Sequence, residues 1–365
     1  MLGEDVIVHG SYVREEFPKL VSTIKPAYIG IFSIWPETYR HVLSEAWSCG
    51  IPCIVSDIGT LRERAMLHGG LSATIILYKY AKKGVLLMKK NKLVAPVLKW
   101  VGGKRQLIET FTPLLPNRIT SYCEPFVGGG ALLFHLQPNT AYVNDINSDL
   151  ICVYTVIRDS VEELIEELKQ YKNESDFFYA VRDWDRSPGK YASLTEVQKA
   201  ARILYLNKTC YNGLYRVNNA GEFNSPFGNY KNPNIVNEPV LRAVNAYFNS
   251  ASIHFSSVGY AEILGTIKKG TFVYLDPPYD PVSETASFTG YSKGGFSKQD
   301  QIRLRECCDE LDKRGIKFML SNSATAFIME QYSAYNITTV QAKRAINSVA
   351  SKRGDVDEVV VRNYE

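Results

Sequence analysis

The hydrophobic pattern from residue 119 onward alternates short apolar runs with stretches of helical periodicity. Five of the apolar runs have the length of buried strands, and they cover residues 119–123, 141–144, 252–255, 272–275 and 317–320. Apolar positions at helical spacing predict a helix over 161–168 with a charged outer face, and a second helix over 195–207. Residues 336–340 and 357–362 are expected to pair as an antiparallel hairpin. This alternation predicts an α/β fold with a doubly wound core.

A glycine-rich turn follows the first apolar run. The sequence from Glu124 to Gly130 reads Glu-Pro-Phe-Val-Gly-Gly-Gly, and an apolar stretch then begins at Ala131, so that a strand, a glycine turn and a helix succeed one another. Glycine lets the backbone approach a ligand where a side chain would clash. Asp145 ends the next run, about 20 residues past the turn, where doubly wound folds place the acceptor for a ribose hydroxyl. This pattern fits a dinucleotide-dependent enzyme as well as a methyltransferase.

The tetrapeptide Asp276-Pro277-Pro278-Tyr279 directly follows the apolar run at 272–275. The carboxylate of Asp276 and a carbonyl of the rigid Pro-Pro backbone can each accept a hydrogen from one planar amino group. Tyr279 can stack on the ring that carries this group. Two acceptors draw the amino nitrogen out of conjugation and leave its lone pair free for a methyl cation. A strand end with a proline-rich turn is the alternative interpretation.

A third segment of interest precedes the first run. It reads Lys99-Trp100-Val-Gly-Gly-Lys104. Trp100 can cover an adenine or a sulfonium, and Lys104 can meet a carboxylate. The alternative interpretation is an N-terminal turn with a core tryptophan.

Taken in order, these segments resemble the motifs of the Dam-like D12 class of adenine-N6 DNA methyltransferases. The resemblance covers residues from about 88 to 365. It implies a Rossmann-like, S-adenosylmethionine-dependent methyltransferase core with a helical target-recognition insertion. It also implies transfer of a methyl group from S-adenosyl-L-methionine to adenine N6 within GATC sites of double-stranded DNA. The target base is expected to be flipped out of the duplex, because its amine cannot be reached inside the stack.

The resemblance assigns residues to catalysis and to the cofactor. The implied catalytic residues are Asp276, Pro277, Pro278 and Tyr279, with Asp276 as a hydrogen-bond acceptor for the amine and not as a general base. The implied cofactor-binding residues are Trp100, Lys104, Glu124, Phe126, Gly128, Gly130, Asp145 and Asp276. In this family a turn after the strand at 317–320, here Ser321 and Asn322, lies near the catalytic pocket.

Residues 205–208, 211–216 and 221–231 resemble the target-recognition segment of the same family. Arg216 matches the arginine that reads a guanine through O6 and N7. Lys208 stands where a phosphate-binding arginine is expected, which keeps the charge but loses the planar fork. The other implied DNA-binding residues are Lys99 for the outer guanine, Tyr211 for insertion into the base stack, Leu214 for a thymine methyl, and Asn212, Asn224, Pro226 and Tyr230. An ordinary polar loop after a packed helix is the alternative.

Composition agrees with an intracellular DNA-binding enzyme without requiring one. The chain has 365 residues and a net charge of +4, a mild excess that permits DNA binding but does not predict it. No run approaches the roughly 20 apolar residues that a membrane span requires. Seven cysteines lack the spacing of a metal site or a disulfide framework, so reduced thiols, no metal and a cytoplasmic location are expected. We expect a monomer, because flipping one base needs no second subunit.

The first 87 residues do not belong to the methyltransferase pattern. Glu37 and Glu45, followed by a turn at 50–52 and a short strand, resemble the nucleotide-sugar half of a GT-B, family-4 glycosyltransferase. The acceptor half of such an enzyme is missing, so an inert αβ fragment is expected.

The chain is therefore divided into a partial glycosyltransferase-like αβ fragment at 1–75, a linker at 76–92, a methyltransferase core at 93–155 and 250–365, and a target-recognition domain at 156–249. Two alternatives to a methyltransferase are a DNA-binding protein that has lost catalysis and a glycosyltransferase carried by the N-terminal part. The intact tetrapeptide at 276–279 argues against the first alternative, and truncation argues against the second.

Overall fold

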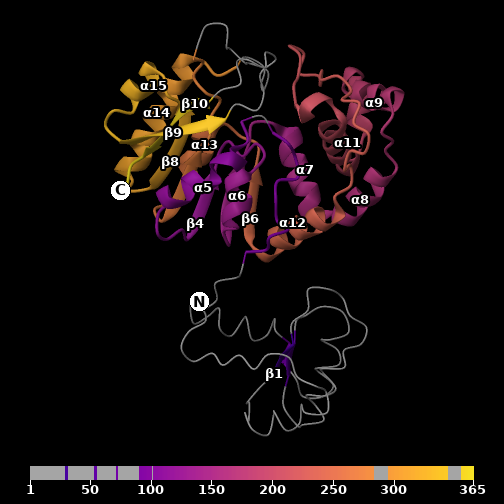
Figure 1. Cartoon of the computed structure of the whole chain (residues 1–365), viewed down its shortest axis with the longest axis horizontal. Helices are drawn as coiled ribbons and strands as arrows, with labels where there is room; N and C mark the ends of the chain where they lie inside the picture. Colours follow the sequence, from indigo (N-terminus) through magenta and orange to yellow (C-terminus); the bar gives the residue numbers. More distant parts are fainter. Residues whose placement is uncertain are drawn as a thin grey trace. The chain divides into compact units, whose positions relative to one another are not determined.

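The computed structural model describes residues 90–100, 102–282, 295–343 and 355–365, together with three short strands nearer the N-terminus (Figure 1). The chain divides into two compact units, Met1–Lys89 and Lys90–Glu365. In the first unit the described strands form a parallel sheet in the order β1 (Ile29–Ile31), β2 (Cys53–Val55) and β3 (Leu71–Ser72). The strand expected after the turn at 50–52 is β2. Glu37 and Glu45 lie outside the described residues, so the glycosyltransferase resemblance stays a prediction.

A seven-stranded sheet forms the centre of the second unit, in the order β6-β5-β4-β7-β8-β10-β9 (Figure 1). Its strands are β4 (Ser121–Glu124), β5 (Thr140–Asn144), β6 (Ser252–Ser256), β7 (Thr271–Leu275), β8 (Lys317–Ser323), β9 (Asn336–Lys343) and β10 (Asp355–Arg362). The strands from β6 to β8 pair in parallel, whereas β10 runs antiparallel to both β8 and β9. Each predicted strand is present, and the closing hairpin is β9 and β10. The expected Rossmann-like α/β core is therefore confirmed.

Helices cover both faces of this sheet. Near one face lie η2 (Lys104–Leu107), α5 (Ile108–Phe111), η3 (Thr112–Leu114), α6 (Ala131–Leu136), α7 (Ser148–Asp159) and α12 (Glu238–Ser250), and near the other lie α13 (Tyr260–Thr266), α14 (Lys298–Lys313) and α15 (Ala326–Gln331). Successive side chains of β7 alternate between the two cores: Phe272 and Tyr274 pack in the first, and Val273 and Leu275 in the second. All of β7 is buried, as expected for a parallel strand covered on both faces.

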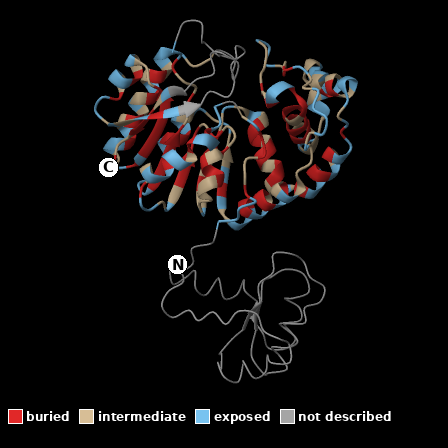
Figure 2. Cartoon of the chain, viewed as in Figure 1, coloured by how far each residue is buried: buried red, intermediate tan, exposed pale blue. Residues whose placement is uncertain are grey.

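The insertion between β5 and β6 carries a helical group beside the sheet (Figure 1). It contains α8 (Val161–Lys169), α9 (Ser175–Arg182), η4 (Asp183–Arg186), α10 (Pro188–Ser193), α11 (Glu196–Thr209) and η5 (Tyr211–Gly213). The two helices predicted from periodicity are α8 and α11. Thr195 and Gln198 begin α11 with a reciprocal capping box, which satisfies two backbone N–H groups at the helix start. Figure 2 shows α11 as a largely buried helix, with exposed residues on the helices around it.

One local expectation was wrong. Ser321 and Asn322 do not form a turn, because β8 continues to Ser323. The strand is longer than its apolar run since β10 supplies a partner along it: Val360 pairs with Ser321 and Val359 with Asn322. Backbone pairing therefore extends the strand through polar residues, and both side chains are buried.

None of the helices in the described part of the chain is long and apolar enough to cross a lipid bilayer.

Candidate active site and DNA interface

The glycine turn and the Asp276 tetrapeptide leave the sheet at the same edge. Strands β4 and β7 are parallel neighbours, with Cys123 opposite Val273, so Glu124 and Tyr274 end side by side. From β4 the chain builds one half of the sheet through β5 and β6, and from β7 it builds the other half through β8. The order of strands thus reverses between β4 and β7. Open α/β sheets bind ligands in the crevice beyond the strand ends at such a point.

The glycine turn has a backbone that other residues adopt poorly. Gly128 and Gly130 have φ values of +46° and +65°, in the left-handed region. A Cβ atom on Gly128 would lie 2.7 Å from Cδ1 of Trp100, so the indole occupies the space that a side chain would need. Trp100 also stacks on Tyr215, with ring centroids 4.8 Å apart. The tryptophan that was expected to cover a ligand therefore packs between the glycine turn and the recognition segment.

Asp145 is fixed beside this turn by backbone donors. The amide N–H of Gly128 donates to Oδ2 and that of Asn147 to Oδ1, each at 3.0 Å. Burial raises the pKa of Asp145 to about 6, and the two N–H donors act in the opposite direction. The Tyr154 hydroxyl donates to the carbonyl of Gly128 at 2.6 Å and braces the same turn from α7. The geometry thus joins Asp145 to the glycine turn, as the sequence indicated.

Glu124 and Phe126 flank the start of the turn. Glu124 is buried and accepts a hydrogen bond of 2.8 Å from the Tyr122 hydroxyl. Burial raises its pKa well above the usual range; the Tyr122 bond lowers it, and the charge of Asp276 raises it further. Phe126 is half-buried against Tyr260, at a centroid distance of 5.3 Å. Glu124 is thus electrostatically coupled to Asp276 across the ends of β4 and β7.

Asp276 faces Lys104. The Lys104 ammonium lies 3.0 Å from Oδ1 of Asp276, and it also lies 4.4 Å from the ring centroid of Tyr279. The ammonium also hydrogen-bonds to the carbonyl of Gly102 at 2.8 Å. Oδ1 of Asp276 is buried, and the Lys104 ammonium is its single partner among the described residues. Burial raises the pKa of Asp276 to about 6, Lys104 opposes this shift, and Glu358 adds to it. Lys104 was expected to meet a carboxylate, and here its ammonium neutralises that of Asp276.

The Pro-Pro backbone is held by side chains from distant segments. The carbonyl of Pro278 accepts a hydrogen bond of 2.8 Å from the Gln301 amide. Gln301 accepts in turn from Asn322 at 3.0 Å, and the Asn322 oxygen accepts from the backbone N–H of Asp280 at 3.0 Å. Pro277, in contrast, has no donor to its carbonyl within the described ranges. Only one of the two proline carbonyls is thus left open.

Sequence reasoning missed Gln301 and Glu358. Gln301 lies on an amphipathic helix, and nothing in the local pattern distinguishes it. Glu358 accepts a hydrogen bond of 2.8 Å from the Tyr279 hydroxyl. Glu358 directly precedes the three valines of β10 and follows another acidic residue, Asp357, so the local pattern did not single it out. Asn322 was singled out, although for a turn that does not exist.

The recognition segment is pinned at the end of α11. The buried Asn207 side chain accepts from the Lys99 backbone N–H at 2.8 Å and donates to the Lys99 carbonyl at 2.7 Å and to the Gly213 carbonyl at 3.1 Å. Tyr211 is 58% exposed. The next residue, Asn212, has a positive φ of 58°, which turns the chain at this point. Lys99, predicted far upstream in the sequence, is therefore brought to the same loop as Tyr211 and Asn212.

A small hairpin follows this loop. Arg216 Nε donates to Oδ1 of Asn224 at 2.7 Å, and the two residues are also joined by a backbone hydrogen bond of 2.9 Å. Val217 and Phe223 form an antiparallel bridge between them. Asn224 was predicted to contact DNA, which stays a prediction; in the structure its side-chain oxygen holds the Arg216 side chain.

The remaining predicted contact residues lie on the same segment. Leu214 is half-buried, Pro226 is exposed, and Tyr230 is 38% exposed. The carbonyl of Pro226 accepts from the backbone N–H of Tyr211 at 2.8 Å, which joins the two ends of the segment.

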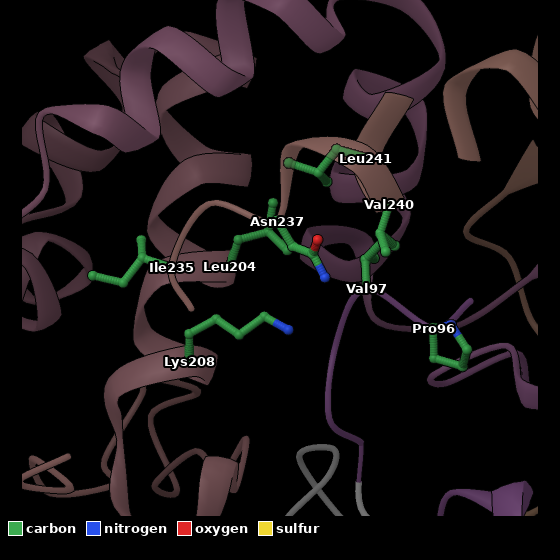
Figure 3. Close-up of a pocket in the computed structure, with 8 residues that line it drawn as sticks. All are labelled: Pro96, Val97, Leu204, Lys208, Ile235, Asn237, Val240 and Leu241. Carbon is green, nitrogen blue, oxygen red and sulfur yellow. The ribbon is translucent and has the colours of Figure 1, made fainter. Parts of the chain in front are cut away.

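Lys208 lies against apolar neighbours (Figure 3). With it, the pocket is lined by Pro96, Val97, Leu204, Ile235, Asn237, Val240 and Leu241. Burial lowers the pKa of Lys208, and the nearby charge of Arg105 lowers it further. No carboxylate pairs with Lys208 in the part of the chain that the structure describes, so its charge remains available to an anion.

The fold brings a glycine turn and three carboxyl groups, those of Glu124, Asp145 and Asp276, to the sheet edge where the strand order reverses. Residues 100–346 match the family of D12 class N6 adenine-specific DNA methyltransferases. The chain is 43% identical to the type II methyltransferase M1.LlaDCHI of Lactococcus lactis subsp. cremoris, over 76% of this chain and 99% of that one. It is 43% identical to the type II methyltransferase M.MjaIII of Methanocaldococcus jannaschii, over 74% and 99%, and 33% identical to the DNA adenine methylase of Escherichia coli (strain K12), over 75% and 95%.

The chain therefore belongs to the D12 class of N6 adenine-specific DNA methyltransferases. It is an adenine-specific DNA methyltransferase, as the sequence predicted.

Proposed function

We propose that the protein transfers the methyl group of S-adenosyl-L-methionine to N6 of a flipped adenine in GATC sites of double-stranded DNA. The observation that carries this proposal is the position of Asp276, whose buried Oδ1 has only the Lys104 ammonium beside it among the described residues and stands at the strand edge that also bears the glycine turn. Each carboxylate oxygen has two lone pairs, so one ammonium neighbour leaves Asp276 able to accept a hydrogen bond from a ligand.

The proposed cofactor site lies around the glycine turn. Asp145 is the proposed acceptor for the ribose hydroxyls, since each of its oxygens keeps a second lone pair beyond the backbone donor that fixes it. Trp100, Glu124, Phe126, Gly128 and Gly130 are proposed to shape the rest of this site. Lys104 is proposed to attract the cofactor carboxylate while it stays near Asp276. The cofactor supplies an electrophilic methyl group on a sulfonium; the chain only aligns and desolvates it.

The proposed amine site consists of Asp276 and one proline carbonyl. Since Gln301 already binds the Pro278 carbonyl, the Pro277 carbonyl is the proposed second acceptor. Asp276 and Pro277 then accept one amine hydrogen each, and the nitrogen lone pair points toward the methyl carbon. Tyr279 stacks on the extruded base. Asp276 positions and polarises the amine, and the proton leaves to water once the methyl group has arrived.

Recognition of the site is proposed to depend on Arg216. Asn224 binds Nε of this arginine, so the two terminal nitrogens remain paired as a fork for O6 and N7 of guanine. Asn224 is thus proposed to orient Arg216. Lys99, Tyr211, Asn212, Leu214, Pro226 and Tyr230 are proposed to contact bases or backbone, and Lys208 a phosphate. Residues 156–249 are accordingly proposed to be the target-recognition domain, acting in a monomer.

Labelled methyl transfer tests the proposal. The unaltered protein is incubated with S-adenosylmethionine labelled in its methyl group and with a GATC duplex or a matched GTTC duplex. We expect label in N6-methyladenine from the GATC duplex alone. No transfer to GATC, despite tight binding of that duplex, would instead support a DNA-binding protein that has lost catalysis. Equal transfer to both duplexes would contradict the proposed site preference.

We propose that residues 1–75 are a glycosyltransferase-like remnant with no part in this reaction, joined by a linker at 76–92. Limited proteolysis within that linker is expected to leave methylation of GATC unchanged. Loss of activity on cleavage would show that the N-terminal unit supports the core.

A further inference from the structure

The Tyr279 hydroxyl lies between two carboxylates. It donates to Oε2 of Glu358 at 2.8 Å. It also lies close enough to Asp276 to lower the pKa of that carboxyl. A phenolic hydroxyl carries a single hydrogen and satisfies one carboxylate at a time. In this structure Glu358 takes that hydrogen.

Asp276 is left with an open acceptor as a result. Its Oδ1 is buried, and the Lys104 ammonium 3.0 Å away is its single partner among the described residues. One ammonium neighbour balances the charge of the carboxylate but leaves it lone pairs for a further donor. If the Tyr279 hydroxyl turned toward Asp276, it would fill an acceptor that the substrate amine needs.

The backbone of Glu358 is fixed within the sheet, so its side chain is in place to accept from the Tyr279 hydroxyl. Its backbone lies in β10 between two partner strands, opposite Ser323 of β8 and Val340 of β9. Its side chain is half-buried, whereas the neighbouring Asp357 is exposed. Successive residues of a strand face opposite sides, so Asp357 provides a matched acidic position that faces away from Tyr279.

We propose that Glu358 is a positioning residue for methyl transfer: it binds the Tyr279 hydroxyl and thereby keeps an oxygen of Asp276 open for the amine of the target base. This inference rests on the proposed function, in which Asp276 accepts that amine. Glu358 acts through Tyr279 and does not itself touch the base. The same bond fixes the plane of the Tyr279 ring, on which the base is proposed to stack.

The charge of Glu358 has a second, separable effect. The titratable and charged groups that face Asp276 come from four elements: Lys104 of η2, Glu124 of β4, Tyr274 and Tyr279 at the end of β7, and Glu358 of β10. Lys104 favours the ionised carboxylate, whereas Glu358 disfavours it. Glu358→Gln keeps an oxygen that accepts from Tyr279 but removes the charge. It is therefore expected to shift the acidic limb of the rate profile to lower pH.

Single-turnover methylation of a GATC duplex at saturating cofactor and duplex, from pH 5 to 9, tests the inference. Glu358→Ala is expected to lower the rate about tenfold, because the freed hydroxyl competes for Asp276. Tyr279→Phe removes the competitor, so the double variant is expected to match Tyr279→Phe alone and to exceed Glu358→Ala. Glu358→Gln is expected to keep most of the rate at pH 8. Asp357→Asn is the matched control and should match the unaltered protein.

Two results would overturn the inference. If the losses from Glu358→Ala and Tyr279→Phe multiply in the double variant, Glu358 does not act through the hydroxyl. If Glu358→Gln loses as much rate as Glu358→Ala and its acidic limb does not move, Glu358 only supports the fold. The proposed function fails separately, when the unaltered protein and Asp357→Asn methylate no adenine.

Discussion

The sheet edge at the ends of β4, β5 and β7 and the recognition segment differ in how far their functional side chains are buried. At this sheet edge, Glu124, Asp145 and Asp276 are carboxyls whose pKa values are raised by burial. In the recognition segment, Tyr211 and Tyr230 are 58% and 38% exposed. Methyl transfer needs acceptors already stripped of water, whereas reading a duplex needs side chains that reach outward. The carboxyls of the proposed active site are thus kept from water by burial, whereas the two proposed DNA-contacting tyrosines are exposed.

The recognition segment is nevertheless anchored to the helical insertion behind it. Arg202 is 1% exposed and lies 2.6 Å from Asp185 in a buried ion pair. Asp185 accepts from the backbone N–H of Phe223 at 2.8 Å, and Arg186 donates to the Phe223 carbonyl at 3.2 Å. The hairpin that carries Arg216 is thus bound to the helical insertion from behind. The exposed residues proposed to contact DNA are therefore carried by a backbone that these contacts fix in place.

The largest expected effect comes from Asp276→Ala. Loss of the acceptor should lower the single-turnover methylation rate at least about 100-fold, comparable to removing one group that stabilises a transition state. Duplex affinity, measured by fluorescence anisotropy, should change little. An equal loss of duplex affinity and methylation rate would show that Asp276 serves DNA binding and not only methyl transfer.

Arg216→Ala should weaken recognition of the DNA sequence and not the methyl-transfer step. We expect discrimination between GATC and a duplex altered at one guanine to fall by about 1–3 kcal/mol. The ratio of kcat/KM for the two duplexes measures this, with Arg303→Ala on the exposed part of α14 as a control. If activity on both duplexes fell together, Arg216 would be a phosphate contact and not a base reader.

Lowering the pH should slow methyl transfer before it weakens recognition of the DNA sequence. Asp276 is proposed to accept the amine as a carboxylate, and burial raises its pKa to about 6. The rate is therefore complete above this pH and is lost as the pH falls through it, about tenfold per unit below. Asp276→Asn should be weakly active without this acidic limb. An unchanged limb in Asp276→Asn would assign the titration to another group, such as Asp145.

The smallest expected effect is that of Asn224→Ala. It frees Nε of Arg216 without removing the guanidinium, so discrimination should fall by about 0.5–1.5 kcal/mol, the usual net value of one hydrogen bond. The matched duplexes used for Arg216→Ala measure it. A loss as large as that of Arg216→Ala would show that Asn224 reads a base directly.

The sequence predicted the parts of the molecule whose signals are local. Strand runs, the glycine turn and the acid after β5 depend on residues that are neighbours in the chain, so β4, β5 and β7 and the placement of Asp145 followed from pattern alone. The end of β8 did not, because the partner that extends it, β10, lies more than 30 residues further on.

The unpredicted parts of the site are tertiary contacts. Gln301, Asn322 and Glu358 hold the tetrapeptide from three separate elements, and Asp185 holds the recognition hairpin from a fourth. Periodicity carries no information on which polar residue of a helix or strand meets which loop. Motif resemblance supplied the residues that are proposed to contact ligands, and the structure adds those that hold them in place.

A crystal structure with a GATC duplex and sinefungin, an analogue with an amine-bearing carbon in place of the methylsulfonium, tests the central claim most directly. The account predicts an extruded adenine with N6 about 3 Å from both Asp276 and the Pro277 carbonyl, and with the analogue bound along the Gly128–Gly130 turn and its amine facing N6. An adenine still stacked in the duplex, or an analogue bound away from that turn, would contradict it.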